Sequence, residues 1–237
     1  ATLANLRIPS LKNLSMIETN FDPESIGSLD GLPALEILQL ASESKPFDDD
    51  SLRVIGSRIS LWYLTLFGTR ITDSGLKHLR GLSRLERLEL SGSQLTDAGV
   101  DQLIVDHPNL MALEIGGSNV TDDGLARLSE FNSLMHLGIS DCDGVGAAGF
   151  AHVMKLENLE VLIMNETAVS DSDMPALLNL KSLKYLAIKR TAVSDASIEY
   201  LSQLKSIKEL YIAETRITPA GVARLRAALP NYNISTK

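Results

Sequence analysis

Residues 61–84 read LWYLTLFGTRITDSGLKHLRGLSR, and this stretch decides the fold. It opens with the pattern L-x-x-L-x-L, formed by Leu61, Leu64 and Leu66. The alternation at the end of this pattern has the period of two that a half-buried strand shows. Apolar residues at every third position follow from Leu76 onward, which is the spacing of one buried helix face. The stretch therefore predicts a strand, a turn and a short helix.

The same pattern recurs along nearly the whole chain. Nine copies begin at Leu11, Leu35, Leu61, Leu85, Leu110, Leu134, Leu159, Leu183 and Ile207. Successive starts lie 24 to 26 residues apart. A single strand-turn-helix unit cannot bury its own apolar face, whereas stacked units share a continuous core. The period therefore predicts a solenoid.

Two polar positions accompany the leucines. A small polar residue stands eight residues after most starts, at Thr19, Thr69, Ser93, Ser118, Cys142, Thr167, Thr191 and Thr215. We expect these side chains to bond backbone groups inside the turns, with Cys142 as a buried rung. A Thr/Ser-Asp pair follows, as in Thr72-Asp73. Its side-chain oxygens suit the free N–H groups and the positive dipole of a helix start.

The form T-x-[IVL]-[ST]-D-x-G-[LV]-x-x-L, which residues 69–79 match, resembles leucine-rich-repeat arrays common in bacteria such as planctomycetes. It is also similar to the ribonuclease-inhibitor and F-box repeat classes. The resemblance covers essentially residues 2–234. It implies an α/β leucine-rich-repeat solenoid, a right-handed horseshoe of about nine full repeats. A parallel β-sheet would line the concave face, and short α-helices would cover the convex face.

We expect residues 1–237 to form a single leucine-rich-repeat domain, the C-terminal part of a longer protein. Leu3, Leu6 and Ile8 read like the end of a preceding helix without a polar cap, although terminal repeats usually carry one. Two loops depart from the repeat, at residues 41–50 and 141–145, and tolerated bulges explain them better than dedicated sites.

Composition limits the partners and the compartment. The net charge of −8 disfavours binding to the phosphate backbone of nucleic acid. The sequence contains no run of 18 apolar residues, so it predicts no membrane span. Cys142 is the single cysteine, which slightly favours a reducing, cytoplasmic location. A secreted or periplasmic location stays open. We expect a monomer.

The sequence offers little chemistry. No pair of its four histidines has metal-ligand spacing, and we find neither a phosphate-binding glycine loop nor a nucleophile motif. The acids at 48–50 match helix-start acids of sister repeats better than a calcium loop, which needs spaced oxygens and a glycine turn. We therefore expect no enzyme activity, no cofactor and no metal.

The strand residues between the leucines should face the concave surface, because side chains alternate along a strand. Exposed aromatics there are favoured as binding hot spots, with charged neighbours adding specificity. The candidate partner-binding residues are Trp62, Tyr63, Phe67, Arg87, Glu89, Glu114, His136, Tyr185, Lys189 and Tyr211. Acids outnumber bases on and beside these rows, which suits a basic protein or peptide.

These features favour a non-catalytic protein-binding scaffold that recognises a partner on its concave sheet. Two alternatives remain. The chain could be a regulatory or targeting module of a larger enzyme or of a surface-anchored protein. It could also bind carbohydrate, because aromatic side chains on a curved sheet can stack on sugar rings.

Overall fold

The computed structural model describes residues 6–17 and 21–237. The expectations for Leu3 and Thr19 lie outside the described residues. The chain divides into two compact units, residues 1–119 and residues 120–237, which are described separately below.

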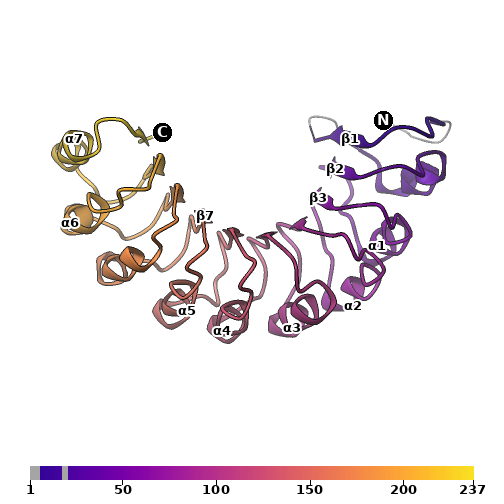
Figure 1. Cartoon of the computed structure of the whole chain (residues 1–237), viewed down its shortest axis with the longest axis horizontal. Helices are drawn as coiled ribbons and strands as arrows, with labels where there is room; N and C mark the ends of the chain where they lie inside the picture. The colour runs from indigo at the N-terminus through magenta and orange to yellow at the C-terminus, as the bar shows by residue number, and fades with distance from the viewer. Residues whose placement is uncertain (1–5, 18–20) are drawn as a thin grey trace. The chain divides into compact units, whose positions relative to one another are not determined.

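Within residues 6–17 and 21–119, the first unit has five parallel strands and four helices. The strands are β1 (Asn13–Met16), β2 (Ile37–Ala41), β3 (Tyr63–Phe67), β4 (Arg87–Glu89) and β5 (Ala112–Glu114). The helices are η1 (Pro23–Gly31), α1 (Asp49–Ile55), α2 (Asp73–Leu76) and α3 (Asp97–Asp106). Strands and helices line opposite sides of this unit (Figure 1).

The second unit repeats this arrangement. Its strands are β6 (His136–Gly138), β7 (Val161–Ile163), β8 (Tyr185–Ala187), β9 (Glu209–Tyr211) and β10 (Asn233–Ser235). Its helices are α4 (Asp122–Leu128), α5 (Ala147–Val153), η2 (Asp171–Asn179), η3 (Asp195–Ser197), α6 (Ile198–Leu201) and α7 (Pro219–Ala228). Again the helices cover one face of the sheet (Figure 1). The face turned away from the helices is called the strand face in both units.

The strand registers confirm the predicted repeat. Residues two positions after each start pair along the first unit, as in Ile37 with Tyr63 and Tyr63 with Arg87. The second unit continues the rule with Val161 beside Tyr185. From the second repeat onward, the leucines of the motif are buried between strands and helices, which makes the shared core that a solenoid requires. In the first repeat, Leu11 and Leu14 are only half-buried. The predicted α/β solenoid is confirmed.

Three helical segments differ from the expected α-helices. The segments η1, η2 and η3 are 3₁₀ helices. Pro175 lies inside η2 and cannot donate a backbone hydrogen bond, so the regular α-helical ladder is interrupted there. The segment η1 begins directly at Pro23.

The Thr/Ser-Asp pairs start the helices as predicted, and they also tie neighbouring repeats together. Thr72 and Thr96 cap α2 and α3 through their hydroxyls. Asp73 then reaches into the next repeat, where its carboxylate accepts from Thr96 N at 2.9 Å and from Thr96 Oγ1 at 2.6 Å. Asp49 accepts from Thr72 in the same way, at 2.8 Å for both bonds. The helix-start aspartate is thus a link between repeats.

This link explains the glycine of the motif. Gly75, Gly99, Gly149 and Gly221 each lie against the linking aspartate of the preceding repeat. A Cβ at any of them would overlap an oxygen of that carboxylate. Glycine therefore makes room for the link, and positive φ plays no part at these four positions.

Where the preceding described repeat supplies no linking aspartate, another residue takes the place of the motif glycine. The sixth repeat starts its helix with Ala147, so no aspartate reaches Ser170 in the next repeat. Asp173, which stands at the glycine position, accepts from Ser170 N at 2.9 Å instead. At the same position in the second repeat, Ser51 Oγ accepts from Asp48 N at 3.2 Å and closes a capping box.

Ser197 is a third variant of the glycine position. It is fully buried and donates to the linking Asp171, which also accepts two bonds from Ser194. Burial of Asp171 opposes its ionisation, yet these hydrogen bonds lower the pKa of its carboxyl group. The acids at 48–50 are helix-start acids, as predicted: Asp48 caps α1, and Asp49 and Asp50 lie in its first turn.

The small polar residues of the turns form the expected ladder mainly in the second unit. Thr167, Thr191 and Thr215 each donate to a carbonyl three residues earlier, at 2.7 to 2.8 Å. Cys142 is buried, as predicted, and its Sγ lies 3.7 Å from Ser140 O. In the first unit, the hydroxyls of Thr69 and Ser93 are buried without a hydrogen-bond partner. The ladder is therefore uneven along the described chain.

His107 occupies a core position that other repeats give to leucine or phenylalanine, such as Leu82 and Phe131. Only 4% of its surface is exposed, and its Nε2 is buried without a hydrogen-bond partner. Burial lowers the pKa of its imidazole, because the charged form cannot be solvated there.

We predict that Gly99→Ala destabilises the protein by about 1–3 kcal/mol, although alanine normally favours a helix interior. The added methyl group would displace the carboxylate of Asp73 from Thr96. Asp73→Ala alone should cost about 1–3 kcal/mol, and the double variant should cost less than the sum of both. Urea denaturation measures each free energy of unfolding.

Gly27→Ala is the matched control, because an added Cβ there meets nothing within 4 Å. Additive effects of Gly99→Ala and Asp73→Ala would show that the glycine does not serve the link.

We predict that His107→Leu stabilises the protein by about 1–2 kcal/mol at pH 7, since it removes an unsatisfied buried nitrogen. The native chain should also lose stability as the pH falls below about 6.5, the ordinary histidine pKa. Below that pH the unfolded chain binds a proton that the folded chain resists. Between pH 8 and pH 5, the urea midpoint should therefore depend less on pH in the variant than in the native chain. An unchanged pH profile would contradict the assignment.

Candidate partner-binding surfaces

The first unit gathers five of the predicted residues on neighbouring strands β3 and β4, at or beside the strand face. They are called the Tyr63 cluster and comprise Trp62, Tyr63, Phe67, Arg87 and Glu89. The Trp62 and Tyr63 rings lie 5.8 Å apart, and the Arg87 guanidinium lies 5.0 Å over the Tyr63 ring. Phe67, 38% exposed, offers apolar surface on the same strand. The register that pairs Tyr63 with Arg87 produces this grouping.

Glu89 is less accessible than its place on the strand face suggests. It is 8% exposed, and its carboxylate accepts from Tyr63 Oη at 2.8 Å and from Thr65 Oγ1 at 3.0 Å. Burial and the bond to Glu89 raise the pKa of Tyr63, so its phenol is a protonated donor at neutral pH. Within the Tyr63 cluster, Glu89 therefore positions the tyrosine more than it offers surface.

The second unit has a comparable group on and directly after β8 and β9, called the Tyr211 cluster: Tyr185, Lys189, Glu209 and Tyr211. The two tyrosine rings lie 4.9 Å apart, and Lys189 Nζ lies 5.1 Å over the Tyr211 ring. Tyr211 Oη donates to Glu209 Oε2 at 2.7 Å. This bond, with burial, raises the pKa of Tyr211 to about 12. The cluster thus fixes two aromatic rings at the surface.

The remaining predicted residues, Glu114 and His136, lie on strands β5 and β6 of their respective units. Glu114 lies on β5, beside Glu89 in the register, and is half-buried. His136 lies on β6 and is also half-buried. Its neighbour in the register is Val161, which separates it from Tyr185. The sequence placed every candidate at the strand face or its edge but could not show which ones touch.

A row of charged residues lies in the turns that follow strands β6 to β9 of the second unit. It is called the charged row: Asp141, Glu166, Arg190 and Glu214. All four have left-handed backbone, with φ between 55 and 57°. The first unit has glycines with positive φ at the matching positions, namely Gly68, Gly92 and Gly117. Arg190 bridges two neighbours, with bonds of 2.9 Å to Glu166 and 3.1 Å to Glu214.

Left-handed backbone favours glycine, so four charged residues there keep a conformation that strains them. Such strain is concentrated at functional sites in proteins generally. The sequence shows charged residues beside the strand-face rows but does not reveal their left-handed conformation. The available signal was the glycine at the equivalent position of three earlier repeats.

Across residues 6–17 and 21–237, no three His, Cys, Asp or Glu side chains are grouped so that they could hold a metal ion. In the same ranges, no helix has both the length and the apolar character needed to cross a membrane.

Comparison with known families places the repeat. The family model described as "Leucine Rich repeat" matches residues 106–129, which run from the last residue of α3 through β5 to the end of α4. The chain contains a leucine-rich repeat and has the leucine-rich-repeat fold. No curated protein matches it in sequence.

Solved structures share the fold of this leucine-rich-repeat chain. The internalin InlF of Listeria monocytogenes matches over 94% of the chain and 66% of its own length, with 22% identity and a TM-score of 0.61. The internalin C2 of the same bacterium matches over 87% and 80%, with 22% identity and a TM-score of 0.57. The chain thus spans just under two thirds of the length of InlF.

A plant protein has the same architecture. The leucine-rich-repeat ectodomain of the Arabidopsis thaliana receptor kinase GASSHO1/SCHENGEN3 matches over 88% of the chain and 30% of its own length. The identity is 17% and the TM-score is 0.51. At these identities the likenesses establish the fold alone.

We predict that Arg190→Gly leaves the melting temperature unchanged or raises it, although two ion pairs are lost. Glycine relieves the left-handed backbone, and exposed ion pairs contribute little to stability. Differential scanning calorimetry measures the change. Arg190→Lys, which keeps the charge and the strain, is the control. A clear drop in melting temperature for Arg190→Gly alone would show that the bridge is structural.

Proposed function

We propose that the chain is a non-catalytic scaffold that binds a protein or peptide on its strand face. The Tyr211 cluster, bordered by the strained charged row, is the observation that carries the proposal. Two tyrosine rings 4.9 Å apart offer rigid contact area that costs little side-chain entropy on binding. Charged side chains that persist in a strained backbone supply directional contacts around them.

The Tyr63 cluster supports the same role in the first unit. The Tyr63 ring is held by Arg87 and Glu89 before any partner arrives. Preorganised side chains lose less entropy on binding, so they raise affinity. The partner would meet a surface of fixed rings with acidic neighbours such as Glu114 and Glu209, which suits a basic protein or peptide.

The relatives are compatible with this role. The structure of the plant receptor kinase ectodomain is a complex with CASPARIAN STRIP INTEGRITY FACTOR 2. An array of the same fold therefore carries a bound partner in that protein. We extend the proposal to a monomer that binds neither nucleic acid nor a cofactor.

We predict that replacing Tyr63, Phe67 and Tyr211 together by alanine lowers capture of the native partner at least about tenfold, since buried aromatics dominate binding energy. The partner is captured from the source organism and quantified by mass spectrometry. Circular dichroism should stay unchanged. Tyr185→Ala with Tyr211→Ala then tests the second unit separately.

Ile59→Ala with Val105→Ala is the matched control, because these apolar residues are 70% and 78% exposed but lie outside the two clusters. Equal capture by the native chain and the aromatic variant would remove the strand face from the proposal. Glycan-array binding that depends on Tyr185 and Tyr211 would instead favour the carbohydrate-binding alternative.

A further inference from the structure

The charge of the chain is unevenly distributed. Residues 1–180 carry 26 acids and 12 lysines or arginines, whereas residues 181–237 carry four acids and ten lysines or arginines. Although the net charge of the whole chain is −8, residues 181–237 are therefore basic. Within this end, the motif K-S-[LI]-K occurs twice, as residues 181–184 and as residues 205–208. The two copies stand at the same place in adjacent repeats.

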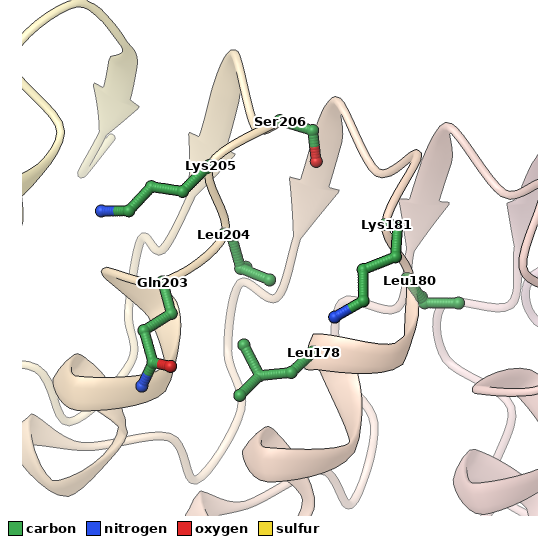
Figure 2. Close-up of a pocket in the computed structure, with 7 residues that line it drawn as sticks. All are labelled: Leu178, Leu180, Lys181, Gln203, Leu204, Lys205 and Ser206. Carbon is green, nitrogen blue, oxygen red and sulfur yellow. The ribbon is translucent and has the colours of Figure 1, made fainter.

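The two motifs border a pocket of 460 Å³, called the lysine pocket, between the turns that lead into β8 and β9. Figure 2 shows Leu178 and Leu204 in the middle, with Lys181 on one side and Gln203 on the other. Lys181 and Lys205 are exposed. Lys205 borders the pocket, but its side chain points away from the two leucines, and its ammonium donates to Ser202 O at 2.8 Å. The pocket thus joins an apolar floor to a basic rim.

An equivalent pocket in the same unit shows that the repeat does not dictate this chemistry. It lies between the turns that lead into β6 and β7, and its volume is 260 Å³. Asn132 and Glu157 occupy there the positions that Lys181 and Lys205 occupy in the lysine pocket. The geometry of stacked turns recurs, but the basic rim is specific to the last repeats.

The side chain before the motif leucine contributes to the difference in volume. In the smaller pocket, Asn158 Nδ2 donates to Asn132 O at 2.9 Å and bridges the two turns. Ser206 stands at the matching position in the lysine pocket. Its shorter side chain leaves the floor of Leu178 and Leu204 open.

We propose that the lysine pocket binds an acidic peptide segment that inserts one aliphatic side chain between flanking carboxylates. The leucine floor would take the aliphatic group, and Lys181, which extends toward that floor, would pair with one carboxylate. Lys205, which points outward from the same rim, would pair with a carboxylate at the outer side of the pocket. A volume of 460 Å³ is in the range of small-ligand sites. A bare phosphate ion would gain nothing from the apolar floor. This surface is separate from the strand face and does not depend on the proposed function.

Fluorescence anisotropy of the full chain tests the proposal with a fluorescein-labelled Glu-Glu-Leu-Glu-Glu peptide. Lys181→Glu with Lys205→Glu should weaken binding at least about tenfold, since charge reversal repels the carboxylates. Ser206→Asn should weaken binding about threefold at constant net charge, because the amide can bridge the turns as Asn158 does. Circular dichroism checks that each variant folds.

Lys155→Glu, in the equivalent pocket, is the matched control and should bind the peptide like the native chain. The peptide Glu-Glu-Gly-Glu-Glu should bind at least about threefold more weakly, because it lacks the side chain for the floor. Equal binding of the leucine and glycine peptides, full competition by inorganic phosphate at matched ionic strength, or unaltered binding by the lysine variants would each overturn the proposal. If the strand-face variants still captured their partner, the proposed function would fail, but the peptide-binding result for the lysine pocket would still stand.

Discussion

The structure depends on one hydrogen-bonded link, the helix-start aspartate that accepts from the cap residue of the following repeat. Asp73 makes two such bonds to Thr96, and Asp195 makes two to Thr218. Hydrophobic burial holds the stack together but is not directional, so it cannot by itself fix how one repeat faces the next. A charged carboxylate shared between a backbone N–H and a hydroxyl supplies that direction.

The link constrains the residues around it. Gly99 and Gly221 stay small because the carboxylate occupies the space of a side chain. Asp173 and Ser51 replace glycine where the preceding repeat offers no aspartate, and each then completes a cap within its own turn. These substitutions would look like random drift without the spatial relation between repeats. They are instead alternative ways to satisfy the same helix-start N–H groups.

The repeat leaves other positions free to vary, and function can be placed there. Directly after the strands, glycines with left-handed backbone in the first unit give way to Asp141, Glu166, Arg190 and Glu214 in the second. In the turns that lead into the strands, neutral and acidic residues give way to the lysines of the last repeats. Both changes occur at surface positions that the core does not restrict, so different surfaces can develop on one scaffold.

The sequence by itself determined the repeat, the buried leucines, the helix caps and the strand-face rows, because each follows from local periodicity and from the chemistry of helix starts. It also placed Cys142 in the core. Only the tertiary structure decided that Glu89 is engaged by Tyr63 and that the charged row is left-handed. It alone paired Lys181 with Lys205 around one pocket. These features depend on contacts between residues about 24 positions apart and on backbone angles, and a linear pattern specifies neither.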